Sequence, residues 1–161
     1  PENPKYRYAL DNQRWSYCAF KNYPVSALTT AKRFITIQTA TATNTVVTGY
    51  DIDEDLDAIF VEGTGQMALA FKLAGLVDES DFYLAELDKM FIDSKVTENA
   101  KGLPYASNLG TAFGNEPYWT GADTNIALSA GAWYVFAKYG FNPFKVDRDK
   151  PLPTEYMFWL D

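Results

Sequence analysis

Five acidic residues lead into a helix in the stretch Tyr50-Asp51-Ile52-Asp53-Glu54-Asp55-Leu56-Asp57-Ala58-Ile59-Phe60-Val61-Glu62-Gly63-Thr64-Gly65-Gln66-Met67. The helix is predicted over residues 63–76, because its apolar residues recur at helical spacing and form one stripe. Glu62 therefore stands where this helix begins. Fixed charges of one sign repel one another, so such a cluster stays in water, binds a cation or faces a substrate that needs carboxylates.

Helical periodicity predicts that most of the remaining chain is α-helical. The threonine-rich residues 39–48 interrupt this pattern and predict a loop or a short β-hairpin. Residues 94–121 are rich in Gly, Pro, Asn and Thr and predict a long loop. The predicted fold is therefore mainly α, built of helical hairpins in a single domain over residues 1–161. The other expected helices are residues 10–23, residues 25–38, one capped by Asp78 or Ser80, and one from Asp123 or Thr124 to Tyr139, ended by Gly140 and Pro143.

Composition and charge exclude several classes of function. The 161 residues carry a net charge of −7, which opposes nucleic-acid and anionic-membrane partners. The chain has no histidine, so catalytic triads and zinc sites that need an imidazole are excluded. We expect no spanning helix or signal segment, since no run of about 18 apolar residues occurs. Cys18 is the one cysteine and is expected to be buried, so it leaves the redox compartment and the localisation open.

Aromatic residues make up 16% of the chain, more than a small core needs, so some rings are expected in a cleft. Asp11-Asn12-Gln13 with Trp15 sets a carboxylate and two amides beside an indole, a combination that suits a sugar. Residues 103–108 and 115–119 set Tyr105 and Trp119 close to hydrogen-bonding side chains in the same way. Helix capping, a core tryptophan and anchoring of the long loop explain the same residues, and these alternatives stay open.

The acidic residues before the helix fit a calcium-binding loop in part. Asp51, Asp53, Asp55, Asp57 and Glu62 occupy positions one, three, five, seven and twelve of such a loop. However, Leu56 stands at position six, where the loop needs glycine, and no amphipathic helix runs directly into Asp51. A solvated acidic loop is the alternative, so calcium is only a weak cofactor prediction.

Glu62 is the strongest single candidate for chemistry. Gly63 and Gly65 beside it let a ligand or another backbone approach closely. The dipole of the following helix favours the ionised carboxylate, which suits a base or a nucleophile. The same placement also serves helix stability alone.

Six blocks of the sequence together carry a resemblance to a known family: Leu10-Asp11-Asn12-Gln13, Gly49-Tyr50-Asp51, residues 60–70, residues 102–108, residues 132–137 and residues 140–144. They resemble the C-terminal half of six-hairpin, (α/α)6-toroid carbohydrate-active proteins. The resemblance covers about residues 10–144 and implies a glycan cleft at one end of a toroid, with carboxylates from helix ends and loops. Because a complete toroid has about twelve helices, it also implies another chain segment or copy that completes the fold.

The leading hypothesis is a glycan-processing module, similar to a glycoside hydrolase, with a pair of carboxylates in an aromatic-lined cleft. A non-catalytic glycan-binding or subunit-completing fragment is the first alternative, and a structural calcium site is the second. The apolar end of residues 145–161 is expected to dock on another surface. The predicted catalytic residues are Glu62 with Asp51, Asp53 or Asp11, the stacking residues are Trp15, Tyr105 and Trp119, and the residues that bind hydroxyl groups are Gln13, Gln66 and Asn108.

Overall fold

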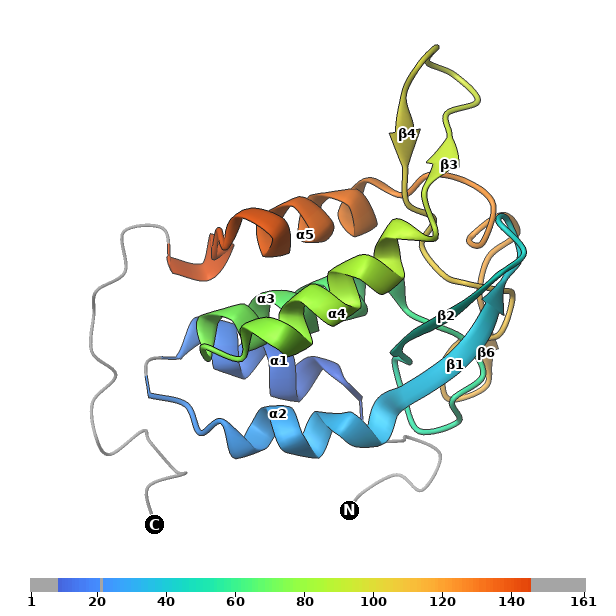
Figure 1. The fold of residues 1–161 in the computed structure, drawn as a ribbon. Coiled ribbons are helices and arrows are strands. Elements are labelled where there is room, and N and C mark those ends of the chain that lie inside the picture. Colours follow the sequence, from blue (N-terminus) through green and yellow to red (C-terminus); the bar gives the residue numbers. More distant parts are fainter. Residues whose placement is uncertain (1–8, 21, 146–161) are drawn as a thin grey trace.

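A computed structural model describes residues 9–20 and 22–145 of the chain (Figure 1). Its central element is helix α3 (Val61–Leu73). From Val61 to Phe71 every residue except Glu62 is buried. A helix that is apolar on all sides must be covered on all sides. Accordingly, α3 contacts α1, α2, α4, α5 and β2.

Four other α-helices in the described residues surround α3. In Figure 1, α5 runs along one side of the α3–α4 pair, and α1 and α2 run along the other. The last helix ends at Gly140, whose φ of 67° is left-handed, as the Gly140–Pro143 pattern predicts. The bounds are α1 (Asp11–Ala19), α2 (Ser26–Ala31), α4 (Val77–Asp88) and α5 (Leu128–Tyr139), with 3-10 turns η1 (Lys32–Phe34) and η2 (Pro143–Lys145).

An antiparallel hairpin of β1 (Ile35–Ala40) and β2 (Thr45–Tyr50) packs against this helical layer. A Cβ atom at Gly49 would lie 2.6 Å from the Ile59 side chain and 2.9 Å from the Thr64 hydroxyl. Glycine at this position therefore lets β2 approach the start of α3 closely. For residues 39–48 the sequence predicts either a loop or a short β-hairpin; the structure has the hairpin, and its strands extend to Ile35 and Tyr50.

The predicted long loop contains regular structure that ties it to the helices. Phe60 forms a β-bridge with Ala106, and Pro104 forms one with Ile126. These bridges hold residues 103–107 across the amino end of α3. Four short strands extend from this region: β3 (Ile92–Asp93) pairs with β4 (Lys101–Gly102), and β5 (Thr111–Phe113) with β6 (Glu116–Pro117).

The prediction of a mainly α fold, with helical hairpins forming half of an (α/α)6 toroid, is wrong. The described residues, of which 43% are helical, form five α-helices and three two-stranded antiparallel sheets, which together make a small mixed domain. The helix expected over residues 25–38 gives way to β1 at Ile35, because β-branched residues there pair with β2. The last helix starts at Leu128, later than predicted, since the Ala127 N–H donates to the Leu103 carbonyl oxygen (2.9 Å) in a non-helical connection.

One continuous core joins the helices and the hairpin. The Tyr83 ring on α4 lies 4.9 Å from the Tyr50 ring at the end of β2 and 5.9 Å from the Phe71 ring on α3, measured between centroids. Cys18 is buried in this core, as predicted. No helix of the described part is long and apolar enough to cross a membrane. The predicted docking tail, residues 145–161, lies outside the described residues except for Lys145.

The packing of α3 on α5 predicts a large difference between two helical glycines. A Cβ atom at Gly65 would lie 3.2 Å from main-chain and Cβ atoms of Trp133, whereas one at Gly131 would meet nothing within 4 Å. We expect Gly65→Leu to lower the free energy of unfolding by about 3 kcal/mol through overpacking. The matched control, Gly131→Leu, should be neutral or stabilising by up to about 1 kcal/mol. Urea unfolding measures both, and equal stability of the two variants would contradict this packing.

Candidate functional site

Glu62 emerges from the first turn of α3, where the chain changes from extended to helical at Phe60. The Val61 N–H donates to the Tyr105 carbonyl oxygen (3.0 Å), and the Thr64 hydroxyl donates to the Phe60 carbonyl oxygen (3.0 Å). These bonds satisfy main-chain groups at the helix start. They also leave Glu62 partly exposed on a helix that is otherwise buried at its beginning.

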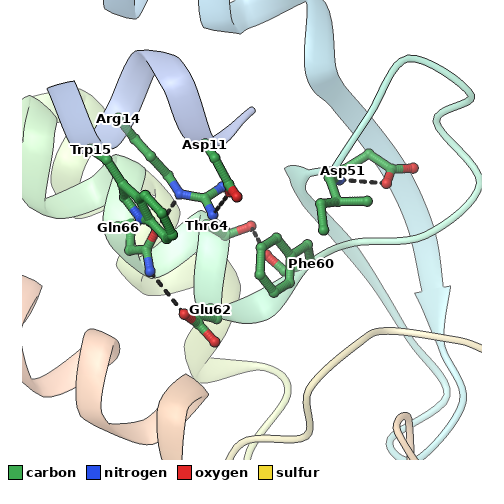
Figure 2. Close-up of polar contacts among 9 residues, drawn as sticks. Asp11, Arg14, Trp15, Asp51, Phe60, Glu62, Thr64 and Gln66 are labelled. Atoms are coloured by element: carbon green, nitrogen blue, oxygen red, sulfur yellow. Dashed lines mark hydrogen bonds and ion pairs between the residues drawn. The ribbon is translucent and has the colours of Figure 1, made fainter. Parts of the chain in front are cut away.

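Glu62 is joined to α1 through Gln66, which lies one helical turn further along α3 (Figure 2). The Gln66 amide nitrogen donates to Glu62 Oε1 (3.0 Å). The Gln66 amide oxygen accepts from the Trp15 indole N–H (2.6 Å) and from Arg14 Nε. A single buried amide therefore connects a carboxylate on α3 with an aromatic ring and a cation on α1.

Arg14 is the functional residue that the sequence reasoning missed. Its side chain is 1% exposed, pairs with Asp11 and lies over the Phe60 ring at 5.0 Å. Burial lowers the pKa of Arg14 from 12.5 to about 10, and the charges of Asp11 and then Glu62 oppose this shift. The three-residue spacing from Asp11 to Arg14 on a predicted helix was the available signal.

The close approach of Arg14 explains the glycine after Glu62. A Cβ atom at Gly63 would lie 2.6 Å from the Phe60 ring and 2.7 Å from Arg14 Nη1. Any larger residue would displace the buried guanidinium or the ring. Gly63 therefore serves the packing of Arg14 beneath the site.

Aromatic rings flank Glu62 and its network. Trp15 is 44% exposed and Trp119 is 57% exposed. The Tyr105 ring lies 4.5 Å from the Trp119 ring and 5.2 Å from the Phe60 ring, between centroids. Burial raises the pKa of Tyr105, and the charge of Glu62 raises it further, so the Tyr105 hydroxyl stays protonated near Glu62. We call the surface formed by these residues the Glu62 face: Asp11, Arg14, Trp15, Glu62, Gln66, Tyr105 and Trp119.

Four residues predicted for the same site take no part in the hydrogen bonds that join Glu62, Gln66, Trp15 and Arg14. The Gln13 amide nitrogen, in the orientation that satisfies both of its groups, donates to the carbonyl oxygens of Ala9 and Leu10 (3.0 Å each). Asn108 donates to the Asp57 carbonyl oxygen (2.8 Å) and accepts from Ser107. Asp51 and Asp53 are completely buried. Figure 2 shows the Asp51 carboxylate pointing away from Glu62.

Asp51 and Asp53 belong to a second polar network, which we call the acid loop (residues 51–57). The carboxylate of Asp51 accepts from the N–H groups of Ile52 and Ala58. That of Asp53 accepts from the N–H groups of Asp55 (3.0 Å) and Gly114 (2.8 Å). Main-chain donors of this loop and of the β5–β6 turn therefore hold both buried carboxylates in place.

Carboxylate oxygens of Asp51, Asp53 and Asp55 lie within 4.8 Å of one another, so these residues could hold a metal ion. Leu56 has a φ of 59°, the left-handed conformation that glycine supplies in a calcium loop. The sixth position of the loop thus bends as required in spite of its leucine side chain. Leucine in place of glycine at position six therefore does not exclude a calcium-binding conformation of the backbone.

Tyr118 lies beside the acid loop. It is 6% exposed, and its hydroxyl has no hydrogen-bond partner in the described part of the protein. Burial raises the pKa of Tyr118, and the charges of Asp51, Asp57 and Asp53 add to this shift. A buried hydroxyl without a partner is costly, and it indicates a polar group that the described residues do not supply.

A separate cavity of about 260 Å³ lies between residues 93–96 of the β3–β4 hairpin and residues 124–126, and it contains none of the predicted site residues. Two residues of its lining are bonded to each other, since the Lys95 ammonium donates to the Asn125 side chain (2.7 Å). Compared with protein-family models, curated proteins and solved structures, the chain has no significant match, so these comparisons assign it to no family. The geometry thus defines two polar sites on one small mixed domain, the Glu62 face and the acid loop.

The buried acid loop predicts an unusual dependence of stability on pH in the presence of a chelator. Burial raises the pKa of Asp51 from 3.8 to about 7, so between these values the folded state binds more protons than the unfolded state. The free energy of unfolding of the wild type should therefore fall relative to that of Asp51→Asn as the pH rises from about 4 to about 7. The expected change is on the order of a few kcal/mol.

Urea unfolding at several pH values measures this difference. The matched control is Asp81→Asn, because Asp81 is exposed on α4. Its stability should follow that of the wild type across the whole range. A wild type that gains stability relative to Asp51→Asn as the pH rises would contradict the predicted direction.

Proposed function

We propose that the Glu62 face binds a carbohydrate and that Glu62 is the carboxylate that accepts hydrogen bonds from it. The observation that carries the proposal is the Glu62 carboxylate, which is bonded to Gln66 and through it to the exposed Trp15 indole, on a face that also holds Tyr105 and the exposed Trp119. A sugar ring offers apolar faces to aromatic rings and hydroxyl groups to carboxylates. The net charge of −7 speaks against nucleic acid as an alternative ligand.

Hydrolysis of the bound glycan is the second candidate function. It would use Glu62 and Asp11 as the pair of carboxylates that glycoside cleavage requires. Asp51 and Asp53, the other predicted partners of Glu62, are buried in the acid loop. One member of the pair must donate a proton, but Glu62 accepts a hydrogen bond from Gln66 and Asp11 is paired with Arg14. This pattern favours binding over cleavage.

Binding to an array of defined oligosaccharides and soluble polysaccharides, followed by titration calorimetry, tests the proposal. We expect Glu62→Gln and Trp119→Ala each to lower the affinity for the strongest ligand about tenfold, a loss of about 1.4 kcal/mol. Tyr139→Ala is the matched control, since Tyr139 is 79% exposed at the far end of α5. It should leave the affinity unchanged. Equal affinity in all three variants, or no ligand for the wild type, would refute the proposal.

A reducing-end assay on the same ligands separates the two candidate functions. If the protein is a hydrolase, the wild type releases new reducing ends, and Glu62→Gln and Asp11→Asn lose this turnover while they remain folded. If it only binds, no reducing ends appear with the wild type. Turnover that survives both substitutions would exclude the carboxylate pair.

We further propose that the ion suited to the acid loop is calcium. Calcium takes six to eight oxygen ligands at about 2.4 Å, so two ligands on opposite sides of the ion are about 4.8 Å apart. Oxygens of Asp51, Asp53 and Asp55 lie within this distance of one another. The unpartnered Tyr118 hydroxyl beside them is the independent observation that favours a bound ion with its water.

Thermal unfolding with calcium and with a chelator tests this candidate at neutral pH. At a calcium concentration about a hundredfold above the dissociation constant, the wild type should gain about 2.7 kcal/mol, or roughly 5–10 °C in Tm. Asp53→Asn should abolish the gain, and the exposed control Asp81→Asn should keep it. A wild type with the same Tm in calcium and in chelator would refute the calcium site.

A further inference from the structure

Gln66 is 1% exposed and bonded on both sides of its amide group. Its oxygen accepts from two N–H donors of α1, those of Arg14 and Trp15, and its nitrogen donates to Glu62. A flipped amide would turn its NH₂ group toward the two donors and its oxygen toward the carboxylate. Only one orientation of this side chain is therefore compatible with its neighbours.

We propose that Gln66 is the positioning residue of the Glu62 face: its amide locks the Trp15 ring and the Glu62 carboxylate into one arrangement. This inference rests on the proposed carbohydrate binding and adds the residue that sets its geometry. In this role Gln66 itself does not contact the ligand; it acts through the Trp15 ring and the Glu62 carboxylate, which it holds in place. This role differs from the hydroxyl binding that the sequence suggests for it.

The fixed end of this arrangement is Arg14. Its guanidinium is buried, paired with Asp11 and enclosed by the Phe60 ring and the Gly63 backbone. Because these contacts fix the position of the guanidinium, the orientation of the Gln66 amide is set by Arg14 and not the reverse. The orientation set at Arg14 is thereby passed to the exposed Trp15 ring and to Glu62.

The locked amide also decides which atom of Glu62 meets a ligand. Oε1 accepts from Gln66, whereas no hydrogen bond from the described residues reaches Oε2. Oε2 is therefore the acceptor available to a donor such as a sugar hydroxyl. The indole N–H of Trp15 already donates to Gln66, so Trp15 offers a ligand its ring face and no hydrogen-bond donor.

The test uses Gln66→Glu, which has nearly the same shape. The new carboxylate still accepts from Arg14 and Trp15, but it places a second charge about 3 Å from Glu62, and two carboxylates at this distance share a proton. The readout is the Trp15 indole N–H signal in an NMR spectrum of the ligand-free protein, assigned through its loss in Trp15→Phe. We expect this signal to move between about pH 5 and about pH 8 in Gln66→Glu and to stay constant in the wild type.

A double variant, Glu62→Gln with Gln66→Glu, serves as the rescue control. It exchanges the amide and the carboxylate, so the hydrogen bond between positions 62 and 66 forms again with its direction reversed. Its indole signal should be independent of pH, and its Tm should exceed that of Gln66→Glu. A merely structural role of Gln66 predicts neither the pH dependence nor its removal by the exchange.

Each outcome decides the inference. An indole signal in Gln66→Glu that is as constant as in the wild type would overturn it. If Gln66→Glu fails to fold, the double variant decides: a folded protein with a constant signal supports the inference, and an unfolded one overturns it. With the strongest oligosaccharide of the array, both variants should bind about tenfold more weakly than the wild type.

The oligosaccharide array and the Gln66→Glu experiments test different claims, so the proposed function and the positioning role can be refuted independently. A wild type that binds an oligosaccharide while Gln66→Glu binds it equally well would overturn the positioning role and leave the proposed function intact. A wild type without any carbohydrate ligand would refute the proposed function, even if the indole signal responds as expected.

Discussion

The burial of α3 on every side is the constraint that shapes this domain. Because residues from Val61 to Phe71 leave only Glu62 partly exposed, the neighbouring helices and β2 must close around the helix. Small residues make this enclosure possible: Gly49, Gly63 and Gly65 stand where β2, Arg14 and α5 approach most closely. The same enclosure leaves one carboxylate at the edge of an apolar core, where its partners are fixed in place.

Sequence periodicity located the helices well and failed where the chain changes its type of structure. The helix predicted over residues 63–76 corresponds to α3, and the left-handed end at Gly140 is as expected. Ile35 and its neighbours fit a helical and a strand pattern equally, and only pairing with β2 decides between them. The toroid expectation rested on the resemblance of six sequence blocks, and the three two-stranded sheets among the five α-helices contradict it. Whether another chain segment or copy contacts this domain stays a prediction.

The candidate site could be predicted only in part, because two networks begin in one short stretch. Asp51 and Glu62 are eleven residues apart, yet main-chain donors bond to the first, whereas Gln66 of α3 links the second to side chains of α1. Spacing alone gives no signal for this separation, since it depends on how the chain turns at Leu56 and Phe60. Asp11, Trp15, Gln66, Tyr105 and Trp119 were assigned beside Glu62 from their chemical types. Arg14 was missed because its spacing from Asp11, the available signal, is also typical of exposed ion pairs and does not indicate that the cation is buried.

The segment that crosses the start of α3 has a mechanical consequence. Burial raises the pKa of Tyr105, and Tyr105 lies close enough to Glu62 for the charge of Glu62 to raise this pKa further. Two residues later, the Ser107 hydroxyl accepts from the Ile59 N–H (2.8 Å). The next residue, Asn108, donates to the carbonyl oxygen of Asp57 in the acid loop. Residues 105–108 thus contact both the Glu62 face and the acid loop. If a ligand on the Glu62 face displaces Tyr105, this segment passes the displacement on to the acid loop, and thermodynamic reciprocity then requires that an ion bound in the acid loop alters the affinity for that ligand.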